Sequence, residues 1–174
     1  MENKSEKAFK TILEMFEQRD YVFLENDDER IIACKDDGKL TCAFVPRITS
    51  KFNVDKYQLF TSMAKQMDLK HIIIVYKESI TSQARKLIEV SNDIEIELFN
   101  EDELQYNLTK HAWVPEHSLY ARKGSEEAQE FSKQKDVLPV ILKTDAVARF
   151  YGYQKGDIVR VKRHNGLVIF RIVK

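Results

Sequence analysis

The sequence contains few of the residues that phosphate-binding loops and disulfide frameworks require. Only five glycines occur in 174 residues, and no glycine-rich loop that could hold a nucleotide phosphate is present. Two cysteines, Cys34 and Cys42, are typical of a chain kept in a reducing compartment. A disulfide between them stays open if they share a hairpin, but free buried thiols are the favoured interpretation.

Long apolar runs and an excess of charge of one sign are also lacking. The longest strongly apolar run, residues 72–76, is far too short to span a bilayer, and the first residues lead into an amphipathic helix. We therefore expect neither a membrane span nor a secretory leader. The 28 basic residues equal the 28 acidic ones in number, so bulk attraction to nucleic acid is not expected.

The charge that is present is unevenly distributed. Residues 89–109 contain acidic side chains and no lysine or arginine, whereas residues 143–174 contain eight basic side chains against two acidic ones. This polarity favours docking on oppositely charged surfaces. With 43% apolar residues, the chain can build the core of one large domain or of two small ones.

The first hundred residues predict a small α/β domain. Three stretches have the apolar spacing or the capping residues of a helix, namely 4–19, 54–67 and 81–90. Residues 30–45 predict a hairpin that turns at Asp36-Asp37-Gly38. Residues 71–76 read as a buried strand, and residues 94–98 alternate as a strand with one wet face does. This order predicts a right-handed parallel βαβ unit.

The remaining residues predict a second, smaller domain of helices and strands. A short helix over residues 101–107 leads to a boundary near residues 109–114, so the two domains are expected at residues 1–110 and 111–174. A polar helix is expected over residues 125–134. Another begins at Thr144 or Asp145 and ends before Gly152, and the Asn165-Gly166 turn joins a final hairpin, residues 157–162 and 167–172.

His111, Glu116 and His117 are candidate metal ligands. Two imidazoles six residues apart, with no cysteine nearby, match no common zinc spacing. The favoured interpretation is a rigid connector that Pro115 stiffens, and we expect no metal or other cofactor.

Asp37-Gly38-Lys39 is an acid-x-lysine triplet of the kind that coordinates magnesium in small nucleases. An upstream acid, Asp27 or Asp28, could complete such a site if the carboxylates converged on one cation. Asp and Gly are also the residues that the predicted turn itself requires, so a magnesium-dependent nuclease is the less favoured alternative.

Two segments are candidates for contact with nucleic acid. Arg160, Lys162 and Arg163 surround the last hairpin turn and could touch phosphates, which leaves a free-standing DNA-binding regulator as a further alternative. At the start of the helix near residue 81, backbone N–H groups could accept a phosphate oxygen, although ordinary capping by Thr81 or Ser82 is favoured.

The last sixty-odd residues contain several short motifs in a fixed order. They are His111, Val114-Pro115-Glu116-His117, Leu138-Pro139, Asp145, Val147-Ala148-Arg149 and Phe150-Tyr151-Gly152, followed by basic strands. This order resembles the fifth-largest subunit of eukaryotic RNA polymerases, whose C-terminal domain is shared with a small subunit of the archaeal enzyme. The resemblance continues more weakly upstream, over residues 70–89 and 9–21.

The resemblance implies a non-catalytic subunit of a multisubunit DNA-directed RNA polymerase. It implies an N-terminal α/β domain of restriction-endonuclease-like topology that forms part of the lower jaw near downstream duplex DNA. It also implies a small α+β C-terminal domain, of the type shared with the archaeal polymerase, that docks on the largest subunit near the subunit-six homologue. The docking residues would be His111, Pro115, Glu116, His117, Asp145, Arg149, Tyr151 and Gly152, and the DNA-proximal residues Lys77, Thr81 and Ser82.

Two departures from the family pattern are visible. The stretch between Val22 and Arg30 is shorter than in cellular members, which suggests a divergent subunit, such as one from a large DNA virus. Thr81-Ser82 stands where the family pattern has Thr-Pro, which weakens the carry-over of a DNA contact. The expected location is the nucleus for a cellular chain, and the viral factory in the cytoplasm, or the virion, for a viral one.

Overall fold

The computed structural model describes residues 3–27, 29–35, 37–46, 51–132 and 138–174. Contacts divide the chain into two compact units, Met1–Tyr106 and Asn107–Lys174, here called the N-terminal and the C-terminal unit. This division falls four residues before the boundary expected after residue 110. Both units combine helices with a sheet, as expected. Among the described residues, no helix has the length and apolar character that crossing a bilayer requires.

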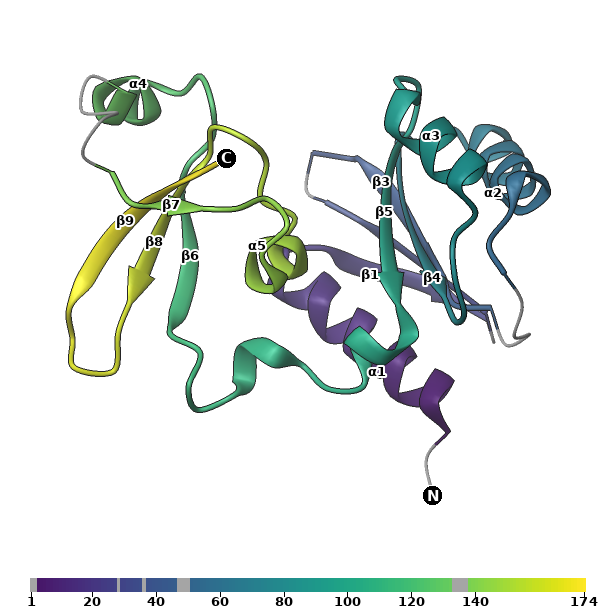
Figure 1. Cartoon of the computed structure of the whole chain (residues 1–174), viewed down its shortest axis with the longest axis horizontal. Helices are drawn as coiled ribbons and strands as arrows, with labels where there is room; N and C mark the ends of the chain where they lie inside the picture. The colour runs from purple at the N-terminus through teal and green to yellow at the C-terminus, as the bar shows by residue number, and fades with distance from the viewer. Residues whose placement is uncertain (1–2, 28, 36, 47–50, 133–137) are drawn as a thin grey trace. The chain divides into compact units, whose positions relative to one another are not determined.

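The N-terminal unit is built on one five-stranded sheet with the order β1-β2-β3-β4-β5 (Figure 1). Its strands are β1 (Val22–Asn26), β2 (Arg30–Cys34), β3 (Leu40–Phe44), β4 (His71–Tyr76) and β5 (Glu95–Asn100). Its helices are α1 (Lys4–Gln18), α2 (Val54–Gln66), α3 (Ser82–Val90) and the 3-10 helix η1 (Glu101–Leu104). The first three strands are antiparallel, and β3, β4 and β5 are parallel, which confirms the predicted βαβ unit.

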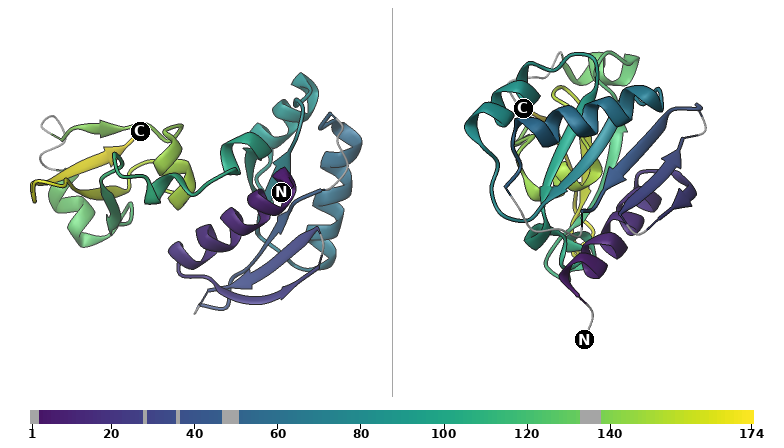
Figure 2. Two further views of the ribbon diagram at one scale, coloured as in Figure 1. Left: turned by 90° about the horizontal axis from the view of Figure 1, so that it is seen from below. Right: turned by 90° about the vertical axis from the view of Figure 1, so that its right-hand side faces the viewer.

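Helices cover both faces of this sheet (Figure 2). Apolar side chains of α2 and α3 join one core cluster with alternate residues of β3 and β4, among them Phe44, Ile72 and Ile74. Helix α1 buries Ile12, Met15 and Phe16 on its own apolar side. Because β4 lies between β3 and β5 in a sheet covered on both faces, its four middle residues are all buried, as its continuous apolar pattern predicts.

The predicted hairpin is formed by β2 and β3. Its turn contains Gly38, whose φ of 79° is a conformation that glycine adopts without strain. The Gly38 N–H donates to the Lys35 carbonyl oxygen at 2.8 Å, and Asp36 lies outside the described residues.

The edge strand β1 is not predicted from the sequence. This strand pairs antiparallel with β2, with an irregularity between Phe23 and Glu25, and all five of its residues are exposed. Its residues, three apolar ones followed by two polar ones, do not alternate between apolar and polar, which is the pattern from which half-buried strands are predicted.

The C-terminal unit contains a four-stranded sheet with the order β6-β8-β9-β7. Its strands are β6 (Glu116–Ala121), β7 (Val140–Ile141), β8 (Ile158–Lys162) and β9 (Val168–Val173). Its helices are α4 (Glu126–Ser132), α5 (Ala146–Tyr151) and the 3-10 helix η2 (Leu108–Lys110). The β8–β9 hairpin and α5 are confirmed, and the helix expected at residues 125–134 ends at Ser132 within the described residues. The helix expected at 101–107 is only the short η1.

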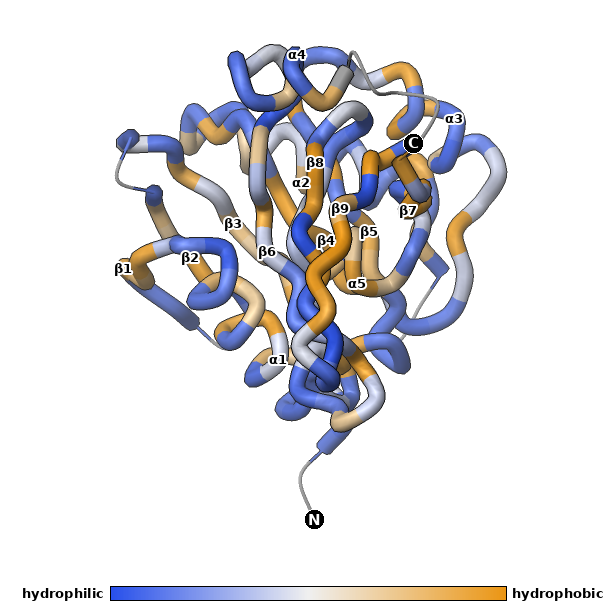
Figure 3. Tube along the Cα trace, turned by 90° about the vertical axis from the view of Figure 1, so that its left-hand side faces the viewer, coloured by the Kyte–Doolittle hydropathy of each residue, from blue (hydrophilic) through white to orange (hydrophobic). Residues whose placement is uncertain are grey.

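Both faces of this small sheet carry a core. One cluster joins α5 to the sheet through Ala148, Val159 and Val161, and the other joins α4 through Ala128 and Ile158. Figure 3 shows that β9 is largely hydrophobic, whereas the β8–β9 turn is hydrophilic.

Candidate docking surface and buried charge clusters

The structure describes all eight residues that the resemblance assigns to docking, and all lie in the C-terminal unit. They are His111 in the loop before β6, Pro115, Glu116 and His117 at its start, and Asp145, Arg149, Tyr151 and Gly152 along α5. Asp145 and Gly152 have structural roles at the two ends of α5. The Asp145 Oδ1 accepts hydrogen bonds from the Val147 N–H at 2.8 Å and the Ala148 N–H at 3.4 Å, and Gly152 has a φ of 67°.

His117 and Tyr151 are half-buried. The His117 Nδ1–H donates to the Pro115 carbonyl oxygen at 2.8 Å, and burial lowers the pKa of His117, which keeps the imidazole neutral at pH 7. Burial likewise raises the pKa of Tyr151, which forms a side-chain hydrogen bond with Thr109 and stacks on Tyr153 at a centroid distance of 5.3 Å. The segment before β6 is therefore held against the end of α5.

The two histidines of the candidate metal site have separate structural roles. The His111 Nδ1 accepts a hydrogen bond from the Trp113 N–H at 3.2 Å, whereas His117 is bound to the carbonyl of Pro115. In the described part of the chain, no three His, Cys, Asp or Glu side chains are grouped as metal ligands. This segment has the contacts of a rigid connector.

Large apolar side chains are exposed on the C-terminal unit. Trp113 is 86% exposed, and five further residues are at least 37% exposed, namely Leu119, Tyr120, Val140, Leu142 and Leu167. They are spread over the segment before β6, β6 itself, β7 and the β8–β9 turn, and Trp113 is by far the most exposed of them. The unit also exposes lysines and arginines, among them Lys143, Lys155, Lys162 and Arg163.

The carboxylates of the candidate nuclease site do not converge. Asp37 forms an ion pair of 2.7 Å with Lys39 in the exposed hairpin turn. Asp27 instead accepts a hydrogen bond from the Arg30 Nε at 2.7 Å, at the opposite end of β2. The five residues of β2 separate the two carboxylates by roughly 17 Å, far beyond what one metal ion can bridge. Asp28 lies outside the described residues.

The loop between β4 and α3 is organised by capping. The Thr81 Oγ1 accepts a hydrogen bond from the Ala84 N–H at 3.3 Å, as the capping interpretation predicts. The Lys77 ammonium donates to the Ser5 Oγ at 2.8 Å and lies 3.4 Å from the Glu101 Oε1. Because the Lys77 side chain is only 11% exposed, its position favours a structural role over contact with DNA. Ser82 is exposed.

A charge cluster that is not predicted from the sequence lies at the C-terminal end of α1. The Arg19 guanidinium donates two hydrogen bonds to Glu97, at 2.7 and 2.8 Å, and its side chain is only 4% exposed. The His71 Nε2 lies 2.7 Å from the Glu97 Oε1, and the His71 Nδ1 lies 2.6 Å from the Thr41 Oγ1. The expectation that alternate residues of β5 face water is therefore wrong at Glu97, where Arg19 covers the strand.

Comparison with known proteins gives two decisive matches. Residues 106–173 match the family described as RNA polymerase Rpb5, C-terminal domain. Over 172 residues, the chain is 31% identical to the DNA-directed RNA polymerases I, II, and III subunit of Dictyostelium discoideum, and the match covers 88% of this chain and 87% of that one. The chain belongs to the Rpb5 family of RNA polymerase subunits.

Other Rpb5-like proteins come from a virus and a plant. The chain is 29% identical over 192 aligned positions to a protein of Invertebrate iridescent virus 6 named as DNA-directed RNA polymerase subunit 454R, covering 97% of this chain and 98% of that one. It is 34% identical over 113 residues to the DNA-directed RNA polymerase V subunit 5A of Arabidopsis thaliana, covering 62% of this chain and 50% of that one.

One solved structure is a distant neighbour of this Rpb5-family chain. It is a Type ISP restriction-modification enzyme bound to DNA, 16% identical, with a TM-score of 0.47, and the match covers 84% of this chain and 12% of the enzyme. A TM-score this low carries no argument, so the restriction-endonuclease-like topology of the N-terminal unit stays a prediction.

Proposed function

We propose that this chain is a non-catalytic subunit of a multisubunit DNA-directed RNA polymerase, in which the C-terminal unit docks on the largest subunit. The observation that carries the proposal is the family match, because it spans almost the whole C-terminal unit. The separation of Asp27 from Asp37 also removes the geometric basis of a nuclease site. The magnesium-binding aspartates of RNA synthesis would lie on other chains.

The surface of the C-terminal unit supports a docking role. Trp113, the most exposed large apolar side chain among the described residues, lies in the connector that precedes β6, beside the docking residues His111 and Pro115. Aromatic anchors surrounded by polar groups dominate the energy of many protein interfaces. The subunit-six homologue would lie nearby in the assembled enzyme.

The N-terminal unit would form part of the lower jaw, near the duplex DNA that enters the enzyme. Thr81 and Ser82 stay the predicted DNA-proximal residues, because the ion pair of Lys77 holds its ammonium group inside the fold. A polymerase of a cellular nucleus, of a viral factory or of a virion is compatible with the relatives, which include cellular and viral subunits.

Affinity purification of the tagged chain from its native source tests this assignment. We expect the largest polymerase subunit to copurify in stoichiometric amount and the isolated chain to synthesise no RNA. Trp113→Ala should reduce the copurified amount at least about fivefold, because a buried interface aromatic contributes upwards of 1 kcal/mol.

Val90→Ala is the matched control for this experiment. Val90 is 69% exposed on α3 in the N-terminal unit, so its truncation should leave copurification unchanged. Purification of the wild-type chain without any polymerase subunit would contradict the proposal, as would RNA synthesis or DNA nicking by the chain alone.

A further inference from the structure

Strand β1 forms a free edge of the sheet in the N-terminal unit. Three consecutive apolar residues lie on it, and Val22, Phe23 and Leu24 are 55%, 49% and 52% exposed. Only β2 pairs with β1 among the described strands, so the backbone groups of its other edge are open to a further strand. Proteins usually protect such edges with charged side chains, proline or a β-bulge. The three positions carry neither charge nor proline, and the strand is irregular only between Phe23 and Glu25.

The apolar surface continues from this edge onto the sheet. In the strand register, Val22 lies opposite Cys34, and Cys34 lies opposite Leu40, so the three side chains form one row on the same face. Leu40 is 38% exposed and Cys34 is partly exposed. The row therefore remains open to solvent, although α2 and α3 cover other parts of this face.

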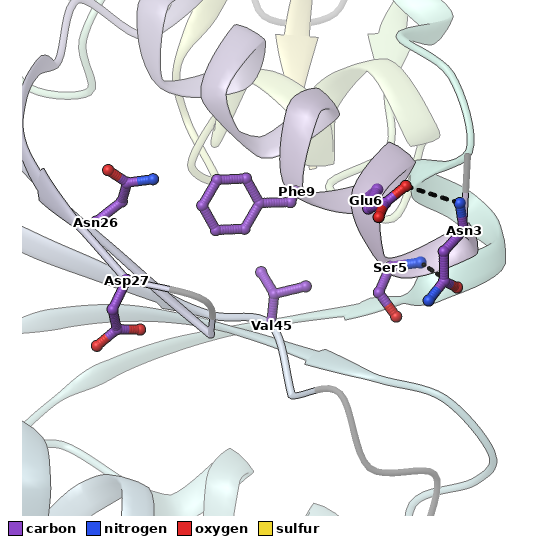
Figure 4. A pocket seen from close by; sticks show the side chains of 7 residues that line it. All are labelled: Asn3, Ser5, Glu6, Phe9, Asn26, Asp27 and Val45. Atoms are coloured by element: carbon purple, nitrogen blue, oxygen red, sulfur yellow. Dashed lines mark hydrogen bonds between the residues drawn. The ribbon is translucent and has the colours of Figure 1, made fainter. Parts of the chain in front are cut away.

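A pocket of about 340 Å³ lies at the far end of the same edge (Figure 4). Phe9 and Val45 form its apolar part, between Asn26 and Asp27 on one side and Asn3 and Glu6 on the other. The seven lining residues are Asn3, Ser5, Glu6, Phe9, Asn26, Asp27 and Val45. An apolar floor with polar groups at the rim suits a long side chain that has a polar head.

The charges around the pocket favour a ligand side chain with a basic head group. The pocket lining contains two acids and no base, and Glu6 uses one carboxylate oxygen to accept the Asn3 N–H at 2.9 Å. Asp27 is already paired with Arg30, so Glu6 is the carboxylate that remains for a ligand. A lysine or arginine could lay its aliphatic stem on Phe9 and direct its cation to Glu6.

From these contacts we infer that β1 receives an extended segment of another protein, with alternating apolar side chains and a lysine or arginine at the end that reaches Glu6. The segment adds a sixth strand to the sheet through main-chain hydrogen bonds. Its alternate apolar side chains cover Phe23 on the α1 face of the sheet, and its basic residue, on that same face, enters the pocket. Strand addition of this kind derives affinity from the backbone and specificity from side-chain pockets.

A second copy of the chain fits this edge less well. Asp20 and Glu25 bracket the apolar residues of β1. In an antiparallel pair of two copies centred on Phe23, Asp20 of each copy would lie beside Glu25 of the other. Like charges in neighbouring cross-strand positions are destabilising, whereas a basic segment is attracted to both.

The test uses the purified full-length chain and three synthetic peptides. The peptide acetyl-RTVTVTR-amide carries arginine at both ends, so it presents one to the pocket in either strand direction. Acetyl-ETVTVTE-amide reverses the charge, and acetyl-RTVPVTR-amide cannot complete the hydrogen-bond ladder. We expect the arginine peptide to shift the backbone amide resonances of residues 22–26 and to bind at least about threefold tighter than the glutamate peptide. The proline peptide should not bind.

Variants of the chain separate the two parts of the surface. Phe23→Asp should weaken binding of the arginine peptide about tenfold, because it places an unpaired charge in the apolar contact. Glu6→Gln should remove the preference for arginine over glutamate while the edge still binds. Val90→Asp, at a still more exposed apolar position on α3, is the control and should bind as the wild type does.

Three results would overturn the inference, and none concerns copurification with polymerase. They are equal binding of the arginine and glutamate peptides, no resonance shift in residues 22–26 with any peptide, and a dimer of the wild-type chain that Phe23→Asp dissociates. The last result would assign the edge to a second copy.

Discussion

The Glu97 carboxylate of β5 links Arg19, at the end of α1, to His71 of β4 and, through His71, to Thr41 of β3. It accepts both hydrogen bonds of the buried Arg19 guanidinium and lies 2.7 Å from the His71 ring, which in turn contacts Thr41. Burial alone would raise the pKa of Glu97, but the Arg19 charge and the hydrogen bonds from His71 and Arg19 hold it well below its ordinary value of 4.5. The folded protein therefore favours the ionised carboxylate.

Glu97→Gln should lower the free energy of unfolding by about 3 kcal/mol, because it leaves the Arg19 guanidinium buried without a carboxylate. The folded pKa lies below the unfolded one, so this stabilisation is present above about pH 4.5 and is lost as the pH falls below it. Urea denaturation at pH 7 and at pH 3.5 measures both effects. Glu89→Gln, at an exposed position of α3, is the control and should behave as the wild type.

If Glu97→Gln and Glu89→Gln have the same stability at pH 7, the cluster does not stabilise the fold as its geometry indicates. The sequence contains no local signal for this cluster, because Arg19 and Glu97 are 78 residues apart. Strict alternation in β5 instead predicts a wet face. The helix ends are different, since Asp145 and Gly152 lie next to the groups that they cap and can be predicted from local spacing.

At the scale of elements, the helices and the two hairpins are predictable because their signals are local. The turns at Gly38 and Gly166 and the cap at Asp145 occur where the residue types require them. Strands β1, β6 and β7 are not predicted. In β6 and β1 most side chains are at least partly exposed, and β7 has only two residues, so neither alternation nor a long apolar run marks them.

Gly152→Ala should destabilise the C-terminal unit by about 1–2 kcal/mol, because a Cβ is strained at a φ of 67°. Gly152→Asn should cost less, since asparagine tolerates the left-handed conformation. Thermal denaturation of both variants measures the difference. Equal stability of the alanine variant and the wild type would show that the end of α5 adopts another conformation in solution.

At the scale of the whole molecule, the balance of charge limits what the chain does alone. The basic residues of the C-terminal unit are offset by acids elsewhere, and the formal charge is zero. Non-specific affinity for DNA comes from the release of counterions by clustered cations, so a balanced chain gains little of it.

We expect the isolated chain to bind a 20-base-pair duplex no tighter than about 10⁻⁵ M at physiological salt. Fluorescence anisotropy at several salt concentrations measures this affinity, and Lys162→Ala should change it little. Submicromolar binding, with a salt dependence that Lys162→Ala or Arg163→Ala reduces, would instead support a free-standing DNA-binding protein.

The two cysteines differ in exposure, so a spectroscopic probe can be attached selectively near the edge of the sheet. Both thiols are free, but Cys42 is buried, and burial raises its pKa to about 12, whereas Cys34 is partly exposed in the row with Val22 and Leu40. A maleimide dye at neutral pH should therefore label Cys34 selectively, without removal of the other thiol. The natural chain thus offers one attachment point for a fluorophore, directly beside the strand whose occupant is to be found.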